Sequence, residues 1–200
     1  MRLYYAPYAC SLALDIVSRE AGVEVERVKV DLDTHTFGDG SDYRQVNPRG
    51  YVPVLEMDDG ERFTETAVLV QYLADLGRNR DLLPAAGTRE RLRVQCWLNF
   101  VATELHKTFS WLWRKDTPEQ TARIVRDKLR TRFAELEAIL HTQSYLTGNQ
   151  FTVADAYAFT VIGWSAEVGF DLSSFPGLCG YLERIGARPT VVAALHAEGE

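Results

Sequence analysis

One cysteine near the start of the chain has the surroundings of a reactive thiol. Cys10 follows the short run Arg2–Tyr5 and lies next to a helical pattern that begins at Ser11. At a junction from strand to helix, free backbone amides and the helix dipole favour negative charge, so a thiolate would be stabilised there. The alternative is a small apolar residue in a buried turn. The junction favours the reactive role.

The number and spacing of the three cysteines do not indicate a disulfide framework or a metal site. Cys10, Cys96 and Cys179 are odd in number and far apart, which fits neither a disulfide set nor paired metal ligands. Cys96 and Cys179 lie in helical patterns beside apolar neighbours, which predicts core packing for both. Dithiol enzymes carry a second cysteine three positions after the first, where this chain has Ala13. A lone thiolate therefore needs an external thiol, and glutathione is the abundant cytosolic one.

A polar stripe in the second half of the chain includes a histidine. Asn99, Thr103, His106 and Ser110 recur at helical spacing within a segment rich in aromatic residues. The stripe is either a solvated helix face or the lining of a cleft where the imidazole meets a ligand, and we favour the cleft. Lys107 adds positive charge that an anionic ligand would need.

Two dipeptides in the first half have the chemistry to hold a peptide-like ligand. Val52-Pro53 precedes a strand, and a cis proline there would turn the Val52 backbone outward to pair with an extended peptide. Thr66 offers donors to a carboxylate, and Glu65 can receive an ammonium group. An ordinary strand-entry proline and an ordinary helix cap are the alternatives.

The elements that must position these residues divide the chain into two halves. Up to Leu76 short strands alternate with helices, whereas helical patterns alone follow. The predicted strands are Arg2–Tyr5, Val25–Val30, Val54–Met57 and Arg62–Phe63, and the predicted helices are Ser11–Ala21 and one that begins near Glu65. The second of these helices has a predicted sheet-facing stripe formed by Glu65, Val68, Leu69, Tyr72, Leu73 and Leu76. Between the strands, Asp33–Val46 is polar and predicts an irregular helix or a long loop.

The predicted boundaries are a first domain at 1–77, a linker at 78–88 and a helical second domain at 89–200. Two helix starts stand out in the second domain, Thr117–Gln120 and Thr152–Asp155, and each has the pattern of a capping box. The first is followed by an apolar face formed by Val125, Leu129, Phe133, Leu136 and Leu140.

The charge and the apolar pattern of the chain argue against nucleic-acid-binding and membrane-spanning proteins. The net charge is -6 over 200 residues and no basic stripe occurs, which argues against nucleic acid as a partner. No window approaches the length of an apolar bilayer span, so a cytoplasmic protein without a membrane partner is expected.

Six stretches together resemble the bacterial beta-class glutathione transferases over essentially the whole chain. They are Tyr5–Ser11, Val46–Pro53, Thr64–Thr66, Trp97–Phe100, Thr103–Lys107 and Phe151–Tyr157. The resemblance implies a thioredoxin-like α/β domain followed by an all-α domain, a homodimer, glutathione as cosubstrate without a metal, and a role in detoxification.

The same resemblance implies which residues bind glutathione. Val52 would pair with its cysteinyl backbone, Glu65 and Thr66 would hold its γ-glutamyl end, and His35, where the family often has lysine, would reach its glycyl carboxylate. The full implied set is Cys10, His35, Val52, Glu65, Thr66, Asn99, Thr103, Glu104, Leu105, His106 and Lys107, with Asn99, Thr103 and Glu104 coming from the neighbouring subunit in some relatives. Tyr5 resembles the catalytic tyrosine of other classes but is not expected to activate the thiol here.

The expected chemistry is attack of the glutathione thiolate on a small hydrophobic electrophile, with Cys10 and His106 as the catalytic residues. The electrophile would lie on an apolar shelf formed by Tyr8, Trp111, Trp113 and Trp164. Tyr8 replaces a residue that is usually small in the family. Cys10 could also form a mixed disulfide with glutathione, giving thiol transfer or peroxide reduction. The alternatives are a non-catalytic glutathione or hydrophobic-ligand binder and a glutathione-dependent reductive dehalogenase.

Overall fold

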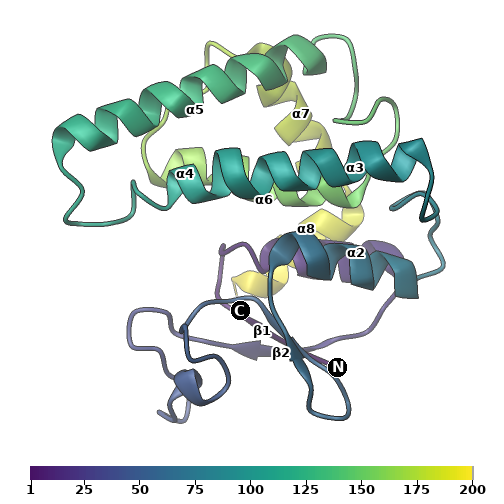
Figure 1. The fold of residues 1–200 in the computed structure, drawn as a ribbon, viewed down its shortest axis with the longest axis vertical. Helices are drawn as coiled ribbons and strands as arrows, with labels where there is room; N and C mark the ends of the chain where they lie inside the picture. Colours follow the sequence, from purple (N-terminus) through teal and green to yellow (C-terminus); the bar gives the residue numbers. More distant parts are fainter. Residues whose placement is uncertain (200) are drawn as a thin grey trace.

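The structure is a computed structural model and describes residues 1–199. A four-stranded sheet with two helices occupies the first part of the chain, and helices alone occupy the rest (Figure 1). The first part contains β1 Arg2–Tyr5, α1 Leu12–Ala21, β2 Glu26–Lys29, the 3-10 turn η1 Tyr43–Gln45, β3 Val54–Glu56, β4 Arg62–Phe63 and α2 Thr66–Leu76. The expected thioredoxin-like order of elements is confirmed.

The helical part begins with one nearly continuous rod and then folds back on itself. The rod consists of α3 Arg89–Phe100, the π-helical segment η2 Val101–His106 and the short α4 Lys107–Phe109. It is followed by α5 Glu119–Leu140, α6 Val153–Glu167, α7 Pro176–Gly186 and α8 Pro189–Glu198. None of the helices within residues 1–199 combines the length and apolar character needed to cross a bilayer.

The sheet has the order β2-β1-β3-β4, with β1 parallel to β2 and the other pairs antiparallel. Three of the four residues of β1 are buried because both faces of the sheet are covered. Leu3 and Tyr5 belong to the main core with α1 and α2, whereas Tyr4 packs with Tyr43 and Val54 in a smaller cluster under the long loop. The loop therefore has its own apolar anchor.

The first helix ends as predicted and begins differently. Gly22 closes α1 with φ 69°, the left-handed conformation that glycine adopts without strain. The predicted helix begins at Ser11, a residue type that often caps helices, but the Ser11 side chain forms no capping hydrogen bond. Its backbone is already helical, and its hydroxyl instead bonds to both the amide and the carbonyl of Ala6, at 3.3 and 3.2 Å. Ser11 thus ties the end of β1 to the start of α1.

The buried stripe of α2 differs from the predicted one. Leu69 and Leu73 are buried as expected, but Val68, Tyr72 and Leu76 are exposed. The predicted stripe assumed that the sheet alone covers this helix. In the structure α2 also contacts α1 and α6, so the buried face is turned toward those helices and an apolar ridge remains outside.

The two predicted helix starts of the second half have different outcomes. The side chains of Thr152 and Asp155 form the predicted capping box at the start of α6. Thr117 and Gln120 form no such box, because Pro118 occupies the capping position of α5 and the Thr117 hydroxyl donates to the Trp111 carbonyl at 2.6 Å. The predicted apolar face of α5 is confirmed: all five of its residues are buried.

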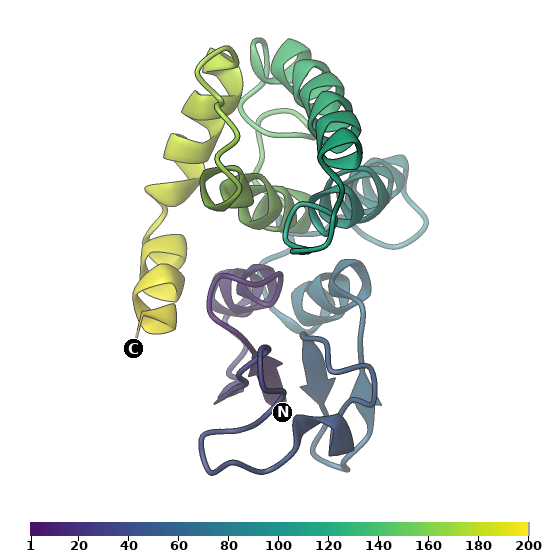
Figure 2. The ribbon, with the colours of Figure 1, turned by 90° about the vertical axis from the view of Figure 1, so that its left-hand side faces the viewer.

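The last helix returns to the first part of the chain. Figure 2 shows α8, in yellow, running down beside α1. At this contact the Glu20 carboxylate of α1 accepts hydrogen bonds from Arg188, at 2.7 and 2.9 Å, and from the Thr190 hydroxyl. The far end of α8 contacts the β1–α1 loop, where the Tyr8 amide donates to the Glu198 carboxylate at 2.6 Å.

Candidate active site

A cavity of about 730 Å³ lies where the two parts of the chain face each other. One wall comes from the β1–α1 loop, the segment before β3 and the start of α2, and the other comes from η2, α4 and α6. Nine of the residues expected in the site line it: Tyr8, Cys10, Val52, Glu65, Thr66, His106, Lys107, Trp113 and Trp164. Residues as far as 156 positions apart in the sequence, Tyr8 and Trp164, thus meet in one cavity.

Cys10 lies in this cavity but is not a thiolate at neutral pH. Its thiol is buried and donates a hydrogen bond to the Val52 carbonyl at 3.4 Å. Burial raises the pKa of the Cys10 thiol to about 11, and the opposing effects of Thr66 and the nearby backbone amide are smaller. The expectation of a stabilised thiolate is therefore wrong for this structure, because desolvation outweighs the helix terminus.

The other two cysteines pack less deeply than predicted. Cys96 is exposed, since the buried stripe of α3 runs through Val94 and Leu98 and leaves the intervening residue outside. Cys179 is half-buried, and its thiol donates to the Leu172 carbonyl at 3.3 Å. Core packing is thus wrong for Cys96 and only partly correct for Cys179.

The segment before β3 presents the Val52 backbone to the cavity. The Val52-Pro53 peptide is cis. The preceding carbonyl, of Tyr51, accepts hydrogen bonds from Asn47 Nδ2 at 2.7 Å and from the Tyr43 hydroxyl at 2.9 Å. These two contacts fix the course of the segment, so that the Val52 backbone is held beside Cys10.

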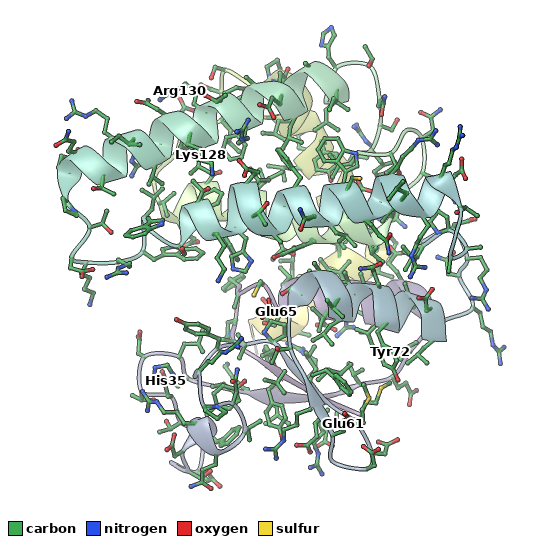
Figure 3. All side chains as sticks on the ribbon, viewed as in Figure 1. His35, Glu61, Glu65, Tyr72, Lys128 and Arg130 are labelled. Atoms are coloured by element: carbon green, nitrogen blue, oxygen red, sulfur yellow. The ribbon has the colours of Figure 1, made fainter. Side chains whose placement is uncertain are left out.

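His35 is held away from the cavity. Its Nδ1 lies 3.1 Å from the Gly50 carbonyl oxygen, and it is not among the residues that line the cavity. Gly50 has φ 70°, and a Cβ there would come within 2.6 Å of the His35 ring, so glycine is required for this approach. Figure 3 shows His35 on the loop beside the sheet, whereas Glu65 lies where the two parts of the chain face each other.

Glu65 and Thr66 begin α2 at the edge of the cavity. The Glu65 backbone has φ 75°, and its carbonyl accepts the amides of Val68 and Leu69. Its carboxylate is exposed and lies 3.6 Å from Arg49 Nη1, a cavity residue that sequence reasoning missed. Thr66 is buried beside it. Arg49 lies within one of the six stretches quoted above, but nothing in the pattern singled out its side chain.

The polar stripe of the long helix is split by the π-helical segment. Because η2 has a wider turn than an α-helix, helical spacing fails across Val101–His106. His106 and Ser110 line the cavity, whereas Asn99 and Thr103 are exposed outside it.

Two further residues of the implied glutathione set also lie outside the cavity. Leu105 is fully buried in the core. The Glu104 carboxylate is 2.8 Å from Arg132 and 3.3 Å from Lys128, both on α5. Figure 3 shows Lys128 on the side of α5 that is turned toward η2. Glu104 therefore joins two helices and does not face this cavity.

His106 is a neutral imidazole with a fixed position. Burial, and next the charge of Lys107, lower the pKa of His106 to about 4. Its Nδ1 lies 2.6 Å from the hydroxyl of Tyr157, which also lines the cavity. The Trp164 ring packs edge-on against the imidazole at 4.9 Å between centroids. Tyr157 belongs to the stretch Phe151–Tyr157, which supported the family resemblance and contains a predicted helix start, but no pattern in the sequence assigned a role to the Tyr157 side chain.

The expected apolar shelf is present in part. Trp113 and Trp164 line the cavity with ring centroids 4.6 Å apart. Trp111 does not line it, because its ring is turned outward under the Arg114 guanidinium.

Tyr8 is held in place by two backbone contacts. Its φ is 58°, its amide donates to the Glu198 carboxylate at 2.6 Å, and its carbonyl accepts from the Trp164 indole at 2.8 Å. The Tyr8 ring is more than half exposed at the cavity mouth.

Tyr5 lies outside the cavity. It is buried, and the Arg27 guanidinium lies 4.1 Å over its ring. Within residues 1–199, no group of three or more His, Cys, Asp or Glu side chains is arranged to hold a metal ion.

Family models match most of the chain. The model for the glutathione S-transferase N-terminal domain matches residues 9–76, and the model for the C-terminal domain matches residues 100–189. The chain belongs to the glutathione S-transferase family. Glutathione S-transferase GstA of Escherichia coli O157:H7 is 42% identical to this transferase over 199 residues, which cover 100% of this chain and 99% of the relative.

Solved structures show the same fold over the full length. A ternary complex of BphK, a bacterial transferase, is 46% identical with a TM-score of 0.96 and full coverage of both chains. A sphingomonad enzyme solved with glutathione is 39% identical, and the beta-class enzyme of Sphingomonas chungbukensis is 40% identical. Both of these have a TM-score of 0.94 and cover 100% of this chain and 99% of their own. The resemblance to bacterial beta-class transferases is thereby confirmed.

Proposed function

We propose that this transferase binds glutathione along the N-terminal wall of the cavity and joins its sulfur to a small hydrophobic electrophile held against Trp113 and Trp164. The observation that carries the proposal is the convergence of Cys10, Val52, Thr66 and His106 on one cavity. Catalysis is favoured over a binding-only or dehalogenase role because the relatives that match the full chain are named glutathione S-transferases, and a 39% identical structure contains glutathione.

The backbone and side chains of the N-terminal wall suit the parts of a γ-glutamyl peptide. The Val52 backbone would pair with the cysteinyl residue of glutathione, as an added strand does. The buried Thr66 would bond the γ-glutamyl carboxylate at the start of α2, and the exposed Glu65 carboxylate would receive the ammonium group. Binding of the glycyl carboxylate by His35 would require the imidazole to leave Gly50.

The chemical step in this proposal begins with glutathione as the thiolate. The sulfur forms a bond to the electrophilic carbon, and the leaving group, such as chloride, departs with its electron pair. Lys107 would favour the anion. A second activity would use Cys10: its sulfur displaces one half of a glutathione disulfide and forms a mixed disulfide, which a second glutathione then resolves.

A homodimer is part of the proposal because α2 and α3 expose an apolar ridge. Val68, Tyr72 and Leu76 of α2 are exposed together with Leu92 of α3, and Figure 3 shows Tyr72 on the outside of α2. The two helices lie side by side, joined by Gln95 and Gln71 at 3.0 Å. A second copy covering this ridge would come close to the exposed Asn99 and Thr103, so that these residues would serve the site across the interface. A cytoplasmic location and a role in detoxification complete the proposal.

The decisive experiment replaces Cys10 by alanine and separates the two activities. We expect Cys10→Ala to conjugate glutathione to a chloronitroarene while losing disulfide reductase activity, with glutathione binding retained in calorimetry. Cys96→Ser, at an exposed position outside the cavity, is the matched control and should keep both activities. Wild-type rates of both reactions in Cys10→Ala would remove Cys10 from the mechanism, and absence of glutathione binding to the wild-type chain would overturn the whole proposal.

A further inference from the structure

We infer that the Tyr157 hydroxyl holds the proton of His106 on Nε2, so that the imidazole presents an N–H donor to the sulfur of a thiol bound in the cavity. Tyr157 is then a positioning residue that acts through His106. The inference rests on the proposed function for the identity of the thiol, which is glutathione. The contact itself does not depend on that identity.

The first step is the geometry of the pair. The Tyr157 hydroxyl lies 2.6 Å from His106 Nδ1, and Tyr157 is 2% exposed. The ring of Trp164 packs edge-on against the imidazole, and the Trp164 indole is itself fixed by its bond to the Tyr8 carbonyl. Among residues 1–199 no side chain or backbone group is bonded to His106 Nε2. With Nδ1 turned to Tyr157, Nε2 is the nitrogen left for a ligand.

The second step is the direction of the hydrogen bond. Burial lowers the pKa of His106 and raises the pKa of Tyr157, so the imidazole is neutral and the phenol is protonated at neutral pH. A neutral imidazole has one N–H and one unprotonated nitrogen, and the partner of one nitrogen decides the state of the other. A phenol is a stronger donor than an imidazole N–H, and an imidazole nitrogen is a stronger acceptor than a phenol oxygen. Tyr157 therefore donates to Nδ1, and the proton of the ring stays on Nε2.

The third step is what such a donor does to a thiol. An N–H that bonds a sulfur anion stabilises it and lowers the pKa of the thiol. When the S–H bond of glutathione breaks, its proton leaves to water, because Nε2 already carries a proton and Nδ1 is occupied by the Tyr157 hydroxyl. The charged groups that share the cavity are Arg49, Glu65, Lys107, Arg114 and Glu167. Of the residues around the sulfur, His106 is thus placed to donate and not to act as a base.

The tautomer can be measured directly in the wild-type protein. Nitrogen-15 NMR of labelled histidine at pH 7 distinguishes the two tautomers, and the signals of His106 are those lost in His106→Asn. We expect the Nε2–H form in the wild type and a mixture of forms in Tyr157→Phe. The Nδ1–H form in the wild type would overturn the inference, whether or not glutathione binds.

The functional consequence is tested by titrating the bound thiol. Thiolate absorbance should show that Tyr157→Phe raises the pKa of bound glutathione by about one unit, which corresponds to one charge-assisted hydrogen bond. In His106→Ala the same Tyr157→Phe change should add nothing, because the two residues act as a unit. An equal shift in both backgrounds would contradict a role through His106. Binding of S-methylglutathione, which has no thiol proton, should be unchanged.

Tyr145→Phe serves as the control for loss of a phenol hydroxyl elsewhere in the helical part, since Tyr145 packs on Phe151 outside the cavity. It should leave the thiol pKa at its wild-type value. If calorimetry detects no glutathione binding, the proposed function is contradicted. The inference about the His106 tautomer is unaffected, because the NMR measurement needs no ligand. Thermal unfolding of each variant shows whether it is folded. If Tyr157→Phe does not fold, the tautomer of His106 in the wild-type protein still decides the inference.

Discussion

At the scale of single residues, opposing forces act on the Cys10 thiol. The start of α1 favours a thiolate, but burial and the apolar surroundings favour the neutral form and prevail, with a pKa of about 11. A protonated Cys10 is a poor nucleophile on its own, so conjugation depends on the thiol of the cosubstrate. The reactive thiolate form of Cys10 is therefore a minor species at neutral pH.

We predict that Cys10 reacts slowly with iodoacetamide at pH 7 and that its rate rises about tenfold for each pH unit between 7 and 9. The sign follows from the raised pKa: the thiolate is the minor form throughout this range and its fraction grows with pH. Cys96, which is exposed on the single chain, is the internal control and should be labelled first at pH 7 in Tyr72→Glu, where no second copy covers α3. Peptide mass spectrometry measures both rates, and a pH-independent rate at Cys10 would contradict the prediction.

At the scale of elements, the π-helical segment η2 decides which residues reach the cavity. It places the consecutive residues His106 and Lys107 on the cavity while Glu104 faces α5. Single-turn π segments are frequent at functional sites because the extra residue re-aims the side chains that follow. Contacts of Glu104 with Lys128 and Arg132 hold the segment to its neighbour.

The start of α6 gives a prediction about stability. Thr152→Ala removes a side chain that caps the helix, so we expect a loss of about 1 kcal/mol in the free energy of unfolding. Thr117→Ala, at the other helix start, is the matched control, because its hydroxyl caps no helix and donates to an exposed carbonyl. We expect a change within about 0.5 kcal/mol there. Urea unfolding measures the free energy of unfolding of both variants. Equal losses in the two variants would show that the capping box does not stabilise α6.

At the scale of the whole molecule, the contact between α1 and α8 joins the two ends of the chain. Although burial opposes it, hydrogen bonds from Arg188 and Thr190 lower the pKa of Glu20. A carboxyl with a lowered pKa in the folded state contributes stability above its ordinary pKa of 4.5 and loses that contribution as the pH falls. The contact is therefore sensitive to acid.

We predict that Glu20→Gln is less stable than the wild type at pH 7 and that the difference disappears as the pH falls below about 4, where the wild-type carboxyl becomes protonated. Chemical unfolding across this range measures the difference. Glu24→Gln, at an exposed position in the same part of the chain, is the control and should differ little from the wild type at any pH. A Glu20→Gln difference that is constant with pH would contradict the assigned ion pair.

The proposed dimer gives a second prediction at this scale. Tyr72→Glu places a charge within the apolar ridge of α2 and should convert a dimer to a monomer in sedimentation velocity. Ile124→Glu, at an apolar position on α5 that is more exposed than Tyr72, should leave the dimer intact. If Asn99 and Thr103 serve the partner's site, the monomer should also bind glutathione less tightly. A wild-type chain that sediments as a monomer would exclude the ridge as an interface.

Local patterns were sufficient for the elements and for part of the site. The strand-and-helix order of the first half, the end of α1 at Gly22, the capping box at Thr152 and the buried face of α5 depend on spacing and turn chemistry, which neighbouring residues determine. The motifs also predicted Cys10, Val52, Thr66 and His106 as site residues, and these four residues line one cavity. The extents of the two domains remain a prediction.

Contacts between distant segments decided the rest. The protonation of Cys10 depends on how deeply the cavity walls bury it, and the exposed ridge of α2 depends on α1 and α6 covering its other side. The place of His35 beside Gly50, the outward turn of Trp111 and the split of the polar stripe by η2 arise from packing that no periodicity encodes. Tyr157 is 51 residues from His106, and only the folding of α6 against η2 brings its hydroxyl to the imidazole.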